Sequence, residues 1–367
     1  MTVMNRLILP IILLFSLMTA VSSCDTGTDT PRGSDGDSDG DSDGDADGDF
    51  DGFVGEHGRL GTDGSKIVDA HGDEIQLKGL SLWWHVKKWG QSGFFNRELP
   101  KNLAEEWGIT LIRAPLGVEN DKRDTGYIYE SDSERKDSFQ LIDNVVKGAI
   151  DAGVYVIIDW HDHWANAHVK EAKEFFTYFG EKYGNHPHVI WEIWNEPQRV
   201  DWSVIKEYAD EMVPHIRQYS KNLILVGTPN WSYSVHEAGK DPVDDDNVAY
   251  VFHFYVAKSG HSLKVGSAYL DSMIKDNLPV FVSEWGLEVT NTDAYVDGGH
   301  FMTTDVDDEQ VRPWLDMMDD NKLSWAFWSI SSQMESGAIV NSTASKTGED
   351  WTEDDIRPAG EYIRKEF

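Results

Sequence analysis

The sequence contains a single cysteine, Cys24, in 367 residues. One cysteine can form neither an internal disulfide nor a thiolate metal site, so the fold must be stabilised by its hydrophobic core. Basic residues are also scarce, with 32 Lys and Arg against 65 Asp and Glu and a formal net charge of −33. Because phosphate binding requires positive charge, this balance argues against nucleic acid as a partner. A neutral polymer is compatible with such a surface.

A long apolar run occurs at the N-terminus. Residues 7–18 are almost entirely apolar, they follow the positive charge of Arg6, and small residues at 20–23 precede Cys24. This pattern predicts a secretory signal peptide over residues 1–23. The small residues before Cys24 resemble the cleavage box of bacterial lipoproteins, which implies an exported protein anchored by lipid at Cys24 to a membrane of the cell envelope or surface. The alternative is an ordinary signal peptide with an incidental cysteine.

Residues 24–53 are predicted to be a disordered linker rich in Asp, Gly and Ser. Aspartate occupies every second position from Asp35 to Asp51, and such a block repels itself and has little apolar area to bury. Parts of it match the opening of an EF-hand calcium loop, but Ala46 or Phe50 stands where the bidentate glutamate is needed. A solvated spacer is therefore favoured over a specific calcium site.

Residues 54–367 are long enough for one barrel domain. Strand-like apolar runs occur at 75–81, 110–116, 154–160, 189–194, 222–227, 248–254, 279–283 and 324–329. Helical patterns occur at 101–107, 138–152, 169–183, 202–219, 262–277, 309–319 and 358–365. This alternation predicts an α/β fold, a single catalytic (β/α)8 TIM barrel. An open doubly wound sheet is the alternative, and the lack of a Gly-rich phosphate loop after the first strand argues against it.

Two of the predicted strands end in a glutamate. The run 189–194 leads into Asn195-Glu196-Pro197, and the run 279–283 leads into Glu284-Trp285-Gly286. A single glutamate at a strand end is more often a solvated loop residue or a helix cap. Two such residues at the carboxyl ends of barrel strands predict catalysis by paired carboxylates, because that end of a barrel carries its chemistry.

Other polar residues fall at the same predicted strand ends. These are Arg113, Asp159, His161, Asp162, His163, His253 and Tyr255. Zinc could use imidazole and carboxylate ligands, but no pair has the helical His-x-x-x-His spacing, and strand alternation points neighbouring residues to opposite faces. Hydrogen bonding to substrate hydroxyls and to carboxylates is therefore predicted in place of a metal site.

These contexts together resemble glycoside hydrolase family five, and most closely its bacterial endo-β-1,4-glucanases, the cellulases of subfamily two. The matching stretches are Ile112-Arg113-Ala114-Pro115, Ile158-Asp159-Trp160-His161, Asn195-Glu196-Pro197, Thr228-Pro229-Asn230-Trp231, His253-Phe254-Tyr255 and Ser283-Glu284-Trp285-Gly286. The resemblance covers nearly everything from about residue 61 onwards. It implies retaining hydrolysis of a β-glucan without a cofactor, with Glu284 as the nucleophile and Glu196 as the acid and base.

The resemblance also implies supporting roles. Arg113 and Tyr255 are expected to hold Glu284 ionised, and the charge of Glu284 to raise the pKa of Glu196. Asn195 is expected to bind the sugar 2-hydroxyl, with His161 and His253 around the same sugar. The expected substrate-binding residues also include Trp84, Trp231 and Trp328, which would stack on sugar rings, and Gln333, which replaces a lysine common at a distal subsite. For any one tryptophan, core filling is the alternative.

The polymer is left open by the sequence. Cellulose, mixed-linkage glucan, xyloglucan and mannan are all compatible with the two-glutamate mechanism. An alternative from another class is a non-catalytic, lipid-anchored protein that binds polysaccharide, and its mark would be loss of Glu196, Glu284 or Arg113. All three are present. A monomer is expected.

Overall fold

The computed structural model describes residues 50–367, except 121–123, 288–294, 297–299, 302–305 and 334. The predicted signal peptide, the lipidation site Cys24 and nearly all of the Asp-rich block lie outside the described residues. Within the described part, no helix has the length and apolar character needed to cross a bilayer.

Within the described residues, eight parallel strands form a closed ring, which confirms the predicted barrel. They are β3 (Lys78–Leu82), β4 (Leu111–Gly117), β5 (Tyr155–His161), β6 (Val189–Glu192), β7 (Ile224–Val226), β8 (Val248–Val251), β10 (Val280–Leu287) and β13 (Trp325–Ile330). Strands that follow one another in this order are paired, and β13 pairs with both β10 and β3, which closes the ring.

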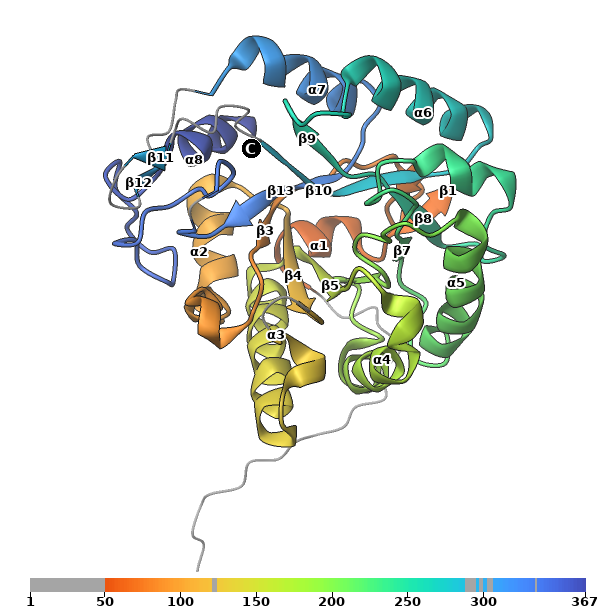
Figure 1. The fold of residues 1–367 in the computed structure, drawn as a ribbon, viewed down its shortest axis with the longest axis horizontal. Coiled ribbons are helices and arrows are strands. Elements are labelled where there is room, and N and C mark those ends of the chain that lie inside the picture. The colour runs from red at the N-terminus through yellow and green to blue at the C-terminus, as the bar shows by residue number, and fades with distance from the viewer. Residues whose placement is uncertain (1–49, 121–123, 288–294, 297–299, 302–305, 334) are drawn as a thin grey trace, which may run out of the picture. The chain divides into compact units, whose positions relative to one another are not determined.

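Helices surround the strands in Figure 1. They are α2 (Glu98–Trp107), α3 (Asp132–Ala152), α4 (Val169–Tyr183), α5 (Trp202–Ile216), α6 (Leu263–Lys275), α7 (Asp308–Asp320) and α8 (Pro358–Ile363). Helix α4 begins and ends as predicted. Helix α3 begins six residues before its predicted start, because Ser131 and Glu134 form a capping box that satisfies backbone N–H groups of its first turn.

The N-terminal end of the ring is closed by α1 (Gly52–His57) and the hairpin of β1 (Gly61–Asp63) and β2 (Lys66–Val68). Buried residues from both join alternate strand residues in one hydrophobic cluster, which includes Val54, Leu60, Ile67, Leu77, Leu111, Ile157, Ile190, Leu225, Val251 and Phe281. The Phe50 ring also lies 5.1 Å from that of His188. The predicted linker boundary after residue 53 is therefore wrong, because it falls inside a packed helix.

The C-terminal ends of three predicted strands differ from the structure by more than one residue. Strand β10 continues through Glu284 to Leu287, because β9 (Phe254–Val256) pairs with its last three residues. Strand β6 ends at Glu192, so Glu196 lies four residues beyond it. The predicted strand 248–254 is broken before β9, where the His253 N–H donates to the carbonyl of Ser232 at 2.8 Å and leaves the ladder.

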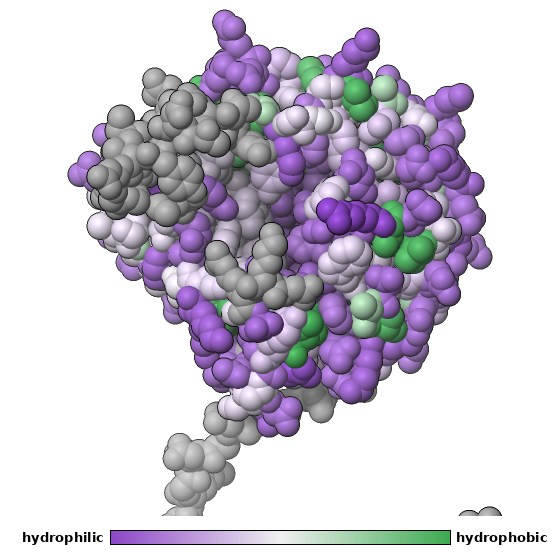
Figure 2. All heavy atoms as spheres, in the orientation of Figure 1, coloured by the Kyte–Doolittle hydropathy of each residue, from purple (hydrophilic) through white to green (hydrophobic). Residues whose placement is uncertain are grey.

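Figure 2 shows the face seen in Figure 1 hollowed near its centre, with mainly hydrophilic side chains around the hollow. The residues that follow the carboxyl ends of the parallel strands meet at one end of the ring. This is the end at which a barrel of this type places its functional groups.

Candidate active site

Arg113, on β4, is fully buried and holds three carboxylates together. Its guanidinium lies 2.9 Å from Asp159, 2.7 Å from Glu192 and 2.8 Å from Glu284. Burial acts to lower the pKa of Arg113, but the facing carboxylates outweigh it and raise the pKa. The guanidinium is therefore a fixed positive charge at the centre of the site.

Glu284 receives a second hydrogen bond from Tyr255. The Tyr255 hydroxyl donates to Oε1 of Glu284 at 2.5 Å, while Arg113 donates to Oε2. Burial and then the charge of Glu284 raise the pKa of Tyr255 well above its usual range, so the hydroxyl keeps its proton and acts as a donor. These contacts confirm the predicted pairing of Glu284 with Arg113 and Tyr255.

Glu196 faces two imidazoles. Its Oε1 lies 3.2 Å from Nδ1 of His253, and its Oε2 lies 3.7 Å from Nε2 of His163. Burial acts to raise the pKa of Glu196, but hydrogen bonding and attraction to these imidazoles outweigh it, so the pKa is lowered. The expectation that the charge of Glu284 would raise this pKa is wrong, because the imidazoles dominate the surroundings of Glu196.

The ring of His253 is oriented by a chain of hydrogen bonds. Ser283 donates from Oγ to Glu192 at 2.6 Å, so its oxygen accepts from Nε2 of His253 at 2.9 Å. The other ring nitrogen, Nδ1, then faces Glu196. A neutral His253 in this orientation can accept a hydrogen bond from a protonated Glu196, whereas a charged His253 donates to an ionised one.

His161 and Asn195 are locked next to Arg113. Nδ1 of His161 lies 2.7 Å from Asp159, and burial followed by repulsion from Arg113 lowers the pKa of His161 to about 3. The neutral ring donates to Asp159 and presents Nε2 to the amide of Asn195 at 3.4 Å. The amide oxygen of Asn195 accepts from Arg113 at 2.6 Å. The Asn195 side chain is thereby held from both ends.

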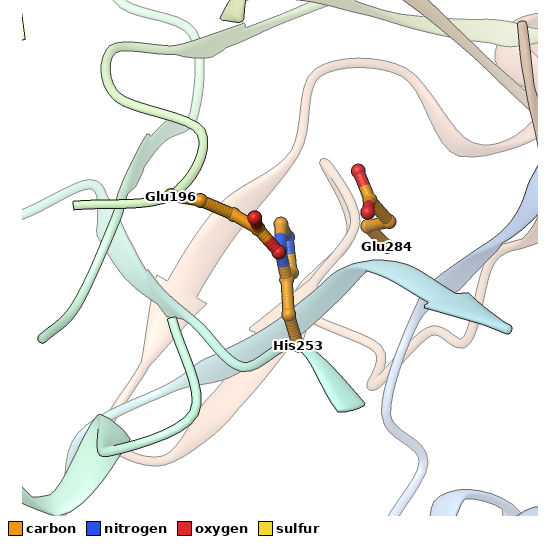
Figure 3. Close-up of side chains that lie close together, drawn as sticks. All are labelled: Glu196, His253 and Glu284. Carbon is orange, nitrogen blue, oxygen red and sulfur yellow. The ribbon is translucent and has the colours of Figure 1, made fainter. Parts of the chain in front are cut away.

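The two glutamates face each other across His253 (Figure 3). One oxygen of Glu196, one of Glu284 and one nitrogen of His253 all lie within 4.8 Å of one another. Such a group could hold a metal ion, but its carboxylates are the two predicted from the sequence to act as acid and nucleophile. Retaining glycosidases hold their two carboxyl groups about 5–5.5 Å apart and inverting ones roughly 6.5–9.5 Å, so a close approach of carboxylate oxygens favours the first class.

Aromatic rings line the site on one side. Trp328 stacks on His161, with ring centroids 5.5 Å apart and planes at 13°, and Trp84 meets the edge of the same ring at 5.0 Å. A side chain at Gly117 would begin 2.6 Å from Trp84, so glycine is what lets the indole pack there. Trp84 and Trp328 form one hydrophobic cluster with Val86, against which Trp83, Trp89 and Tyr255 pack.

Trp231 and Gln333 are not members of that cluster. The Trp231 N–H donates to the carbonyl of Pro197 at 3.1 Å, which ties its turn to the segment carrying Glu196. The Gln333 amide donates to the backbone carbonyl of Trp89 at 2.7 Å. Gln333 therefore supports the segment that carries Trp89, a contact that the sequence did not predict.

Comparison with known proteins identifies the family. The profile of the Cellulase family (glycosyl hydrolase family 5) matches residues 68–334, which is most of the chain. The chain belongs to glycosyl hydrolase family 5.

Curated proteins named endoglucanases resemble the chain over most of its length. It is 40% identical to an endoglucanase A of Evansella cellulosilytica over 304 residues, which are 81% of this chain and 57% of that protein. It is 34% identical to endoglucanase N of Pectobacterium atrosepticum, covering 86% of this chain and 66% of that one. The chain thus spans about three-fifths of the length of these relatives.

Solved family 5 structures share the fold. A protein from Cytophaga hutchinsonii matches with a TM-score of 0.74 and 31% identity, over 85% of this chain and 95% of that one. A variant of the catalytic domain of a Thermobifida fusca endoglucanase, in complex with cellotetraose, matches with a TM-score of 0.73 and 26% identity, over 85% and 98% of the two chains.

Several residues of this family 5 site were not singled out from the sequence. Glu192 is a fully buried carboxylate inside an otherwise apolar strand run, and that unusual position was the signal available for it. Glu335 is half-buried and accepts hydrogen bonds from Trp83 and Ser329, and burial raises its pKa. Glu119 follows β4 and faces His163 at 3.5 Å. No spacing in the sequence connects Glu119 with His163.

Proposed function

We propose that the protein hydrolyses β-1,4-glucosidic bonds within cellulose or related β-glucans, with retention of the anomeric configuration. The observation that carries this proposal is the pair Glu196 and Glu284, with carboxylate oxygens within 4.8 Å of each other on a family 5 barrel. An inverting mechanism needs a wider gap, because a water molecule must stand between the base and the sugar. The proposed reaction therefore passes through a covalent glycosyl-enzyme.

Glu284 is the proposed nucleophile. Two donors, Arg113 and Tyr255, hold its carboxylate in place. The carboxylate attacks the anomeric carbon, while a proton from Glu196 goes to the leaving oxygen. Once the glycosyl-enzyme has formed, Glu196 takes a proton from water, and the resulting hydroxide releases the sugar from Glu284.

The remaining predicted residues would bind the sugar. Asn195, locked between Arg113 and His161, is proposed to hold the 2-hydroxyl through its amide. The rings of Trp328 and Trp84 pack against His161. The ring of Trp231 lies on the turn that is hydrogen-bonded to Pro197. Sugar faces rich in C–H groups pack well on such rings.

A β-glucan is the proposed substrate because the similar curated proteins are named endoglucanases and one similar structure holds cellotetraose. The same chemistry on mannan, xyloglucan or mixed-linkage glucan is the alternative. The assembled contacts of Arg113, Glu196 and Glu284 favour an enzyme over a non-catalytic binding protein. A panel of these glycans in a reducing-sugar assay ranks the substrates.

The test of the mechanism uses Glu284→Ala, Glu196→Ala and the exposed Glu207→Ala as a control. On a glucan, loss of either carboxylate should lower kcat by about 10²–10⁴-fold or more, and the control should keep full rate. On an activated aryl glycoside, Glu196→Ala should retain glycosylation, and azide should accelerate the second step by attacking the glycosyl-enzyme, which yields a β-azide. An inverted first product by NMR, or full activity of Glu284→Ala, would refute the mechanism.

We further propose export and a lipid anchor at Cys24, with the Asp-rich linker as a spacer between membrane and barrel. This rests on the apolar run 7–18 and the small residues before Cys24. Radiolabelled fatty acid should be incorporated by the full chain in a bacterial host and not by Cys24→Ala. Labelling of both proteins, or of neither, would overturn the anchor.

A further inference from the structure

We propose that His163 stores the proton that Glu196 delivers to the leaving oxygen, and that Glu119 holds the imidazole in place for this transfer. The proposal rests on the proposed function, since it concerns the source of the acid proton in that reaction. His163 acts through Glu196 and does not itself contact the sugar, so its role is to position the transferred proton.

The geometry places His163 between two carboxylates. Nδ1 lies 3.5 Å from Glu119, and Nε2 lies 3.7 Å from Glu196. These separations are longer than those of hydrogen bonds, and catalytic contacts of this kind commonly shorten when substrate fills the site. Each ring nitrogen has one carboxylate, so the ring can hold its proton against Glu119 on one side and pass a proton to Glu196 on the other.

The backbone fixes this arrangement. The N–H of Glu196 donates to the carbonyl of Asp162, and the N–H of Gln198 donates to the carbonyl of His163, both at 3.3 Å. The Asp162 carboxylate accepts from the N–H of Trp164 at 2.8 Å and pairs with His168 at 2.7 Å. The segment that carries His163 is therefore joined directly to the segment that carries Glu196.

The charges around the ring favour a proton on it. Burial acts to lower the pKa of His163, but Glu119 and Glu196 outweigh burial and raise it to about 10. The same proton lowers the pKa of Glu196. Other titratable groups around the pair are His161, Asp162 and His168 near His163, and His253, Tyr255, His261 and Glu284 on the side of Glu196.

The proton balance is simple. In the free site the pair holds one proton, mostly on Nε2 of His163, with Glu196 ionised. In the first step that proton moves to Glu196 and on to the leaving oxygen, which leaves His163 neutral. In the second step Glu196 takes a proton from water as the hydroxide attacks the glycosyl-enzyme, and the proton returns to His163. No other reactant is needed.

The inference makes a prediction about pH. Because a pair that shares one proton keeps it to a high pH, activity on a glucan should persist into the alkaline range. In His163→Gln the amide cannot store a proton. Glu196 must then lose its proton at its own pKa, which is lower than the pKa of the proton that the pair shares in the wild type. The basic limb of kcat/KM should then move to lower pH by about one unit or more. Glu119→Gln should move it in the same direction by less.

Two comparisons isolate the effect. An activated aryl cellobioside needs no acid in the first step, so its basic limb should stay in place in every variant, and its hydrolysis also shows that each variant is folded. The matched control is His168→Gln, the same change in the same segment, where the imidazole pairs with Asp162 and not with Glu196. The basic limb of the kcat/KM profile of His168→Gln on the glucan should coincide with that of the wild type.

The outcomes separate three explanations. A shift of the limb to lower pH on the glucan alone supports proton storage. A shift to higher pH in His163→Gln shows that the imidazole acts only as a positive charge that lowers the pKa of Glu196, and overturns the proposal. A lower kcat with an unmoved limb indicates a purely structural role and also overturns it. Absence of glucan hydrolysis by the wild type refutes the proposed function itself.

Discussion

Replacing Arg113 by methionine should destabilise the barrel strongly. Methionine keeps much of the length of the side chain and removes the charge that faces Asp159, Glu192 and Glu284. These carboxylates and the arginine are almost completely buried, and removing one partner from a buried ionic group costs about 3–5 kcal/mol. The free energy of unfolding should fall by about that amount at pH 8.

The loss converts into a change of melting temperature. At about 2.1 cal/mol/K per residue, roughly 320 folded residues unfold with an entropy near 0.7 kcal/mol/K, so the midpoint should fall by about 4–8 °C. The control is Arg97→Met, because Arg97 pairs with Asp151 at the exposed surface. Exposed ion pairs contribute little to stability, so its loss should lower the midpoint by under about 2 °C.

The loss of stability in Arg113→Met, measured against the wild type, should depend on pH. Burial already raises the pKa of Asp159 to about 7 against the attraction of Arg113, and removing the arginine raises it further. A carboxyl with a raised pKa destabilises the fold when it is ionised, and this cost disappears as pH falls through the folded-state pKa. Below about pH 7 Asp159 is protonated in both folded proteins and both gain equally, so the difference from the wild type should shrink as pH falls from about 8 to about 7.

Differential scanning calorimetry of both arginine variants over this pH range measures the effect. A deficit no larger than that of Arg97→Met, or one that grows as pH falls, would refute the reasoning. Arg113→Lys separates charge from geometry, because one ammonium restores charge without the planar set of donors. Arg113→Lys should have a melting temperature between those of Arg113→Met and the wild type, and it should recover little of the activity.

Two further predictions concern residues away from the glutamates. Burial and then His186 lower the pKa of His188 to about 4, so His188 contributes stability above about pH 6.5 that is lost as pH falls through 4. Between pH 7 and 4 the free energy of unfolding of His188→Phe should rise relative to that of the wild type by on the order of 3 kcal/mol. A difference in melting temperature that stays constant across that range would contradict this. Gln333→Lys should change KM for long oligosaccharides and spare the shortest ones, since Gln333 supports the segment of Trp89. Equal changes for short and long substrates would show that Gln333 does not act at a distal subsite.

The sequence by itself determined the barrel and its two central carboxylates. Alternating strand and helix patterns are local properties of the chain, and helix α4 was predicted from them without error. Asn195-Glu196-Pro197 and Ser283-Glu284-Trp285-Gly286 follow apolar runs, so their place at one end of the ring could be inferred. The partners of Glu284 could also be predicted from the sequence, since Arg113 and Tyr255 fall near the same predicted strand ends.

Only the tertiary structure decided how the charges act on one another. Local pattern placed Glu284 at a strand end, but pairing with β9 carries β10 three residues further. The pKa of Glu196 depends on His163 and His253, which follow other strands of the ring, and neither spacing nor composition records that contact. Because electrostatic effects depend on distance and burial, which the order of residues does not contain, the direction of that pKa shift had to come from the fold.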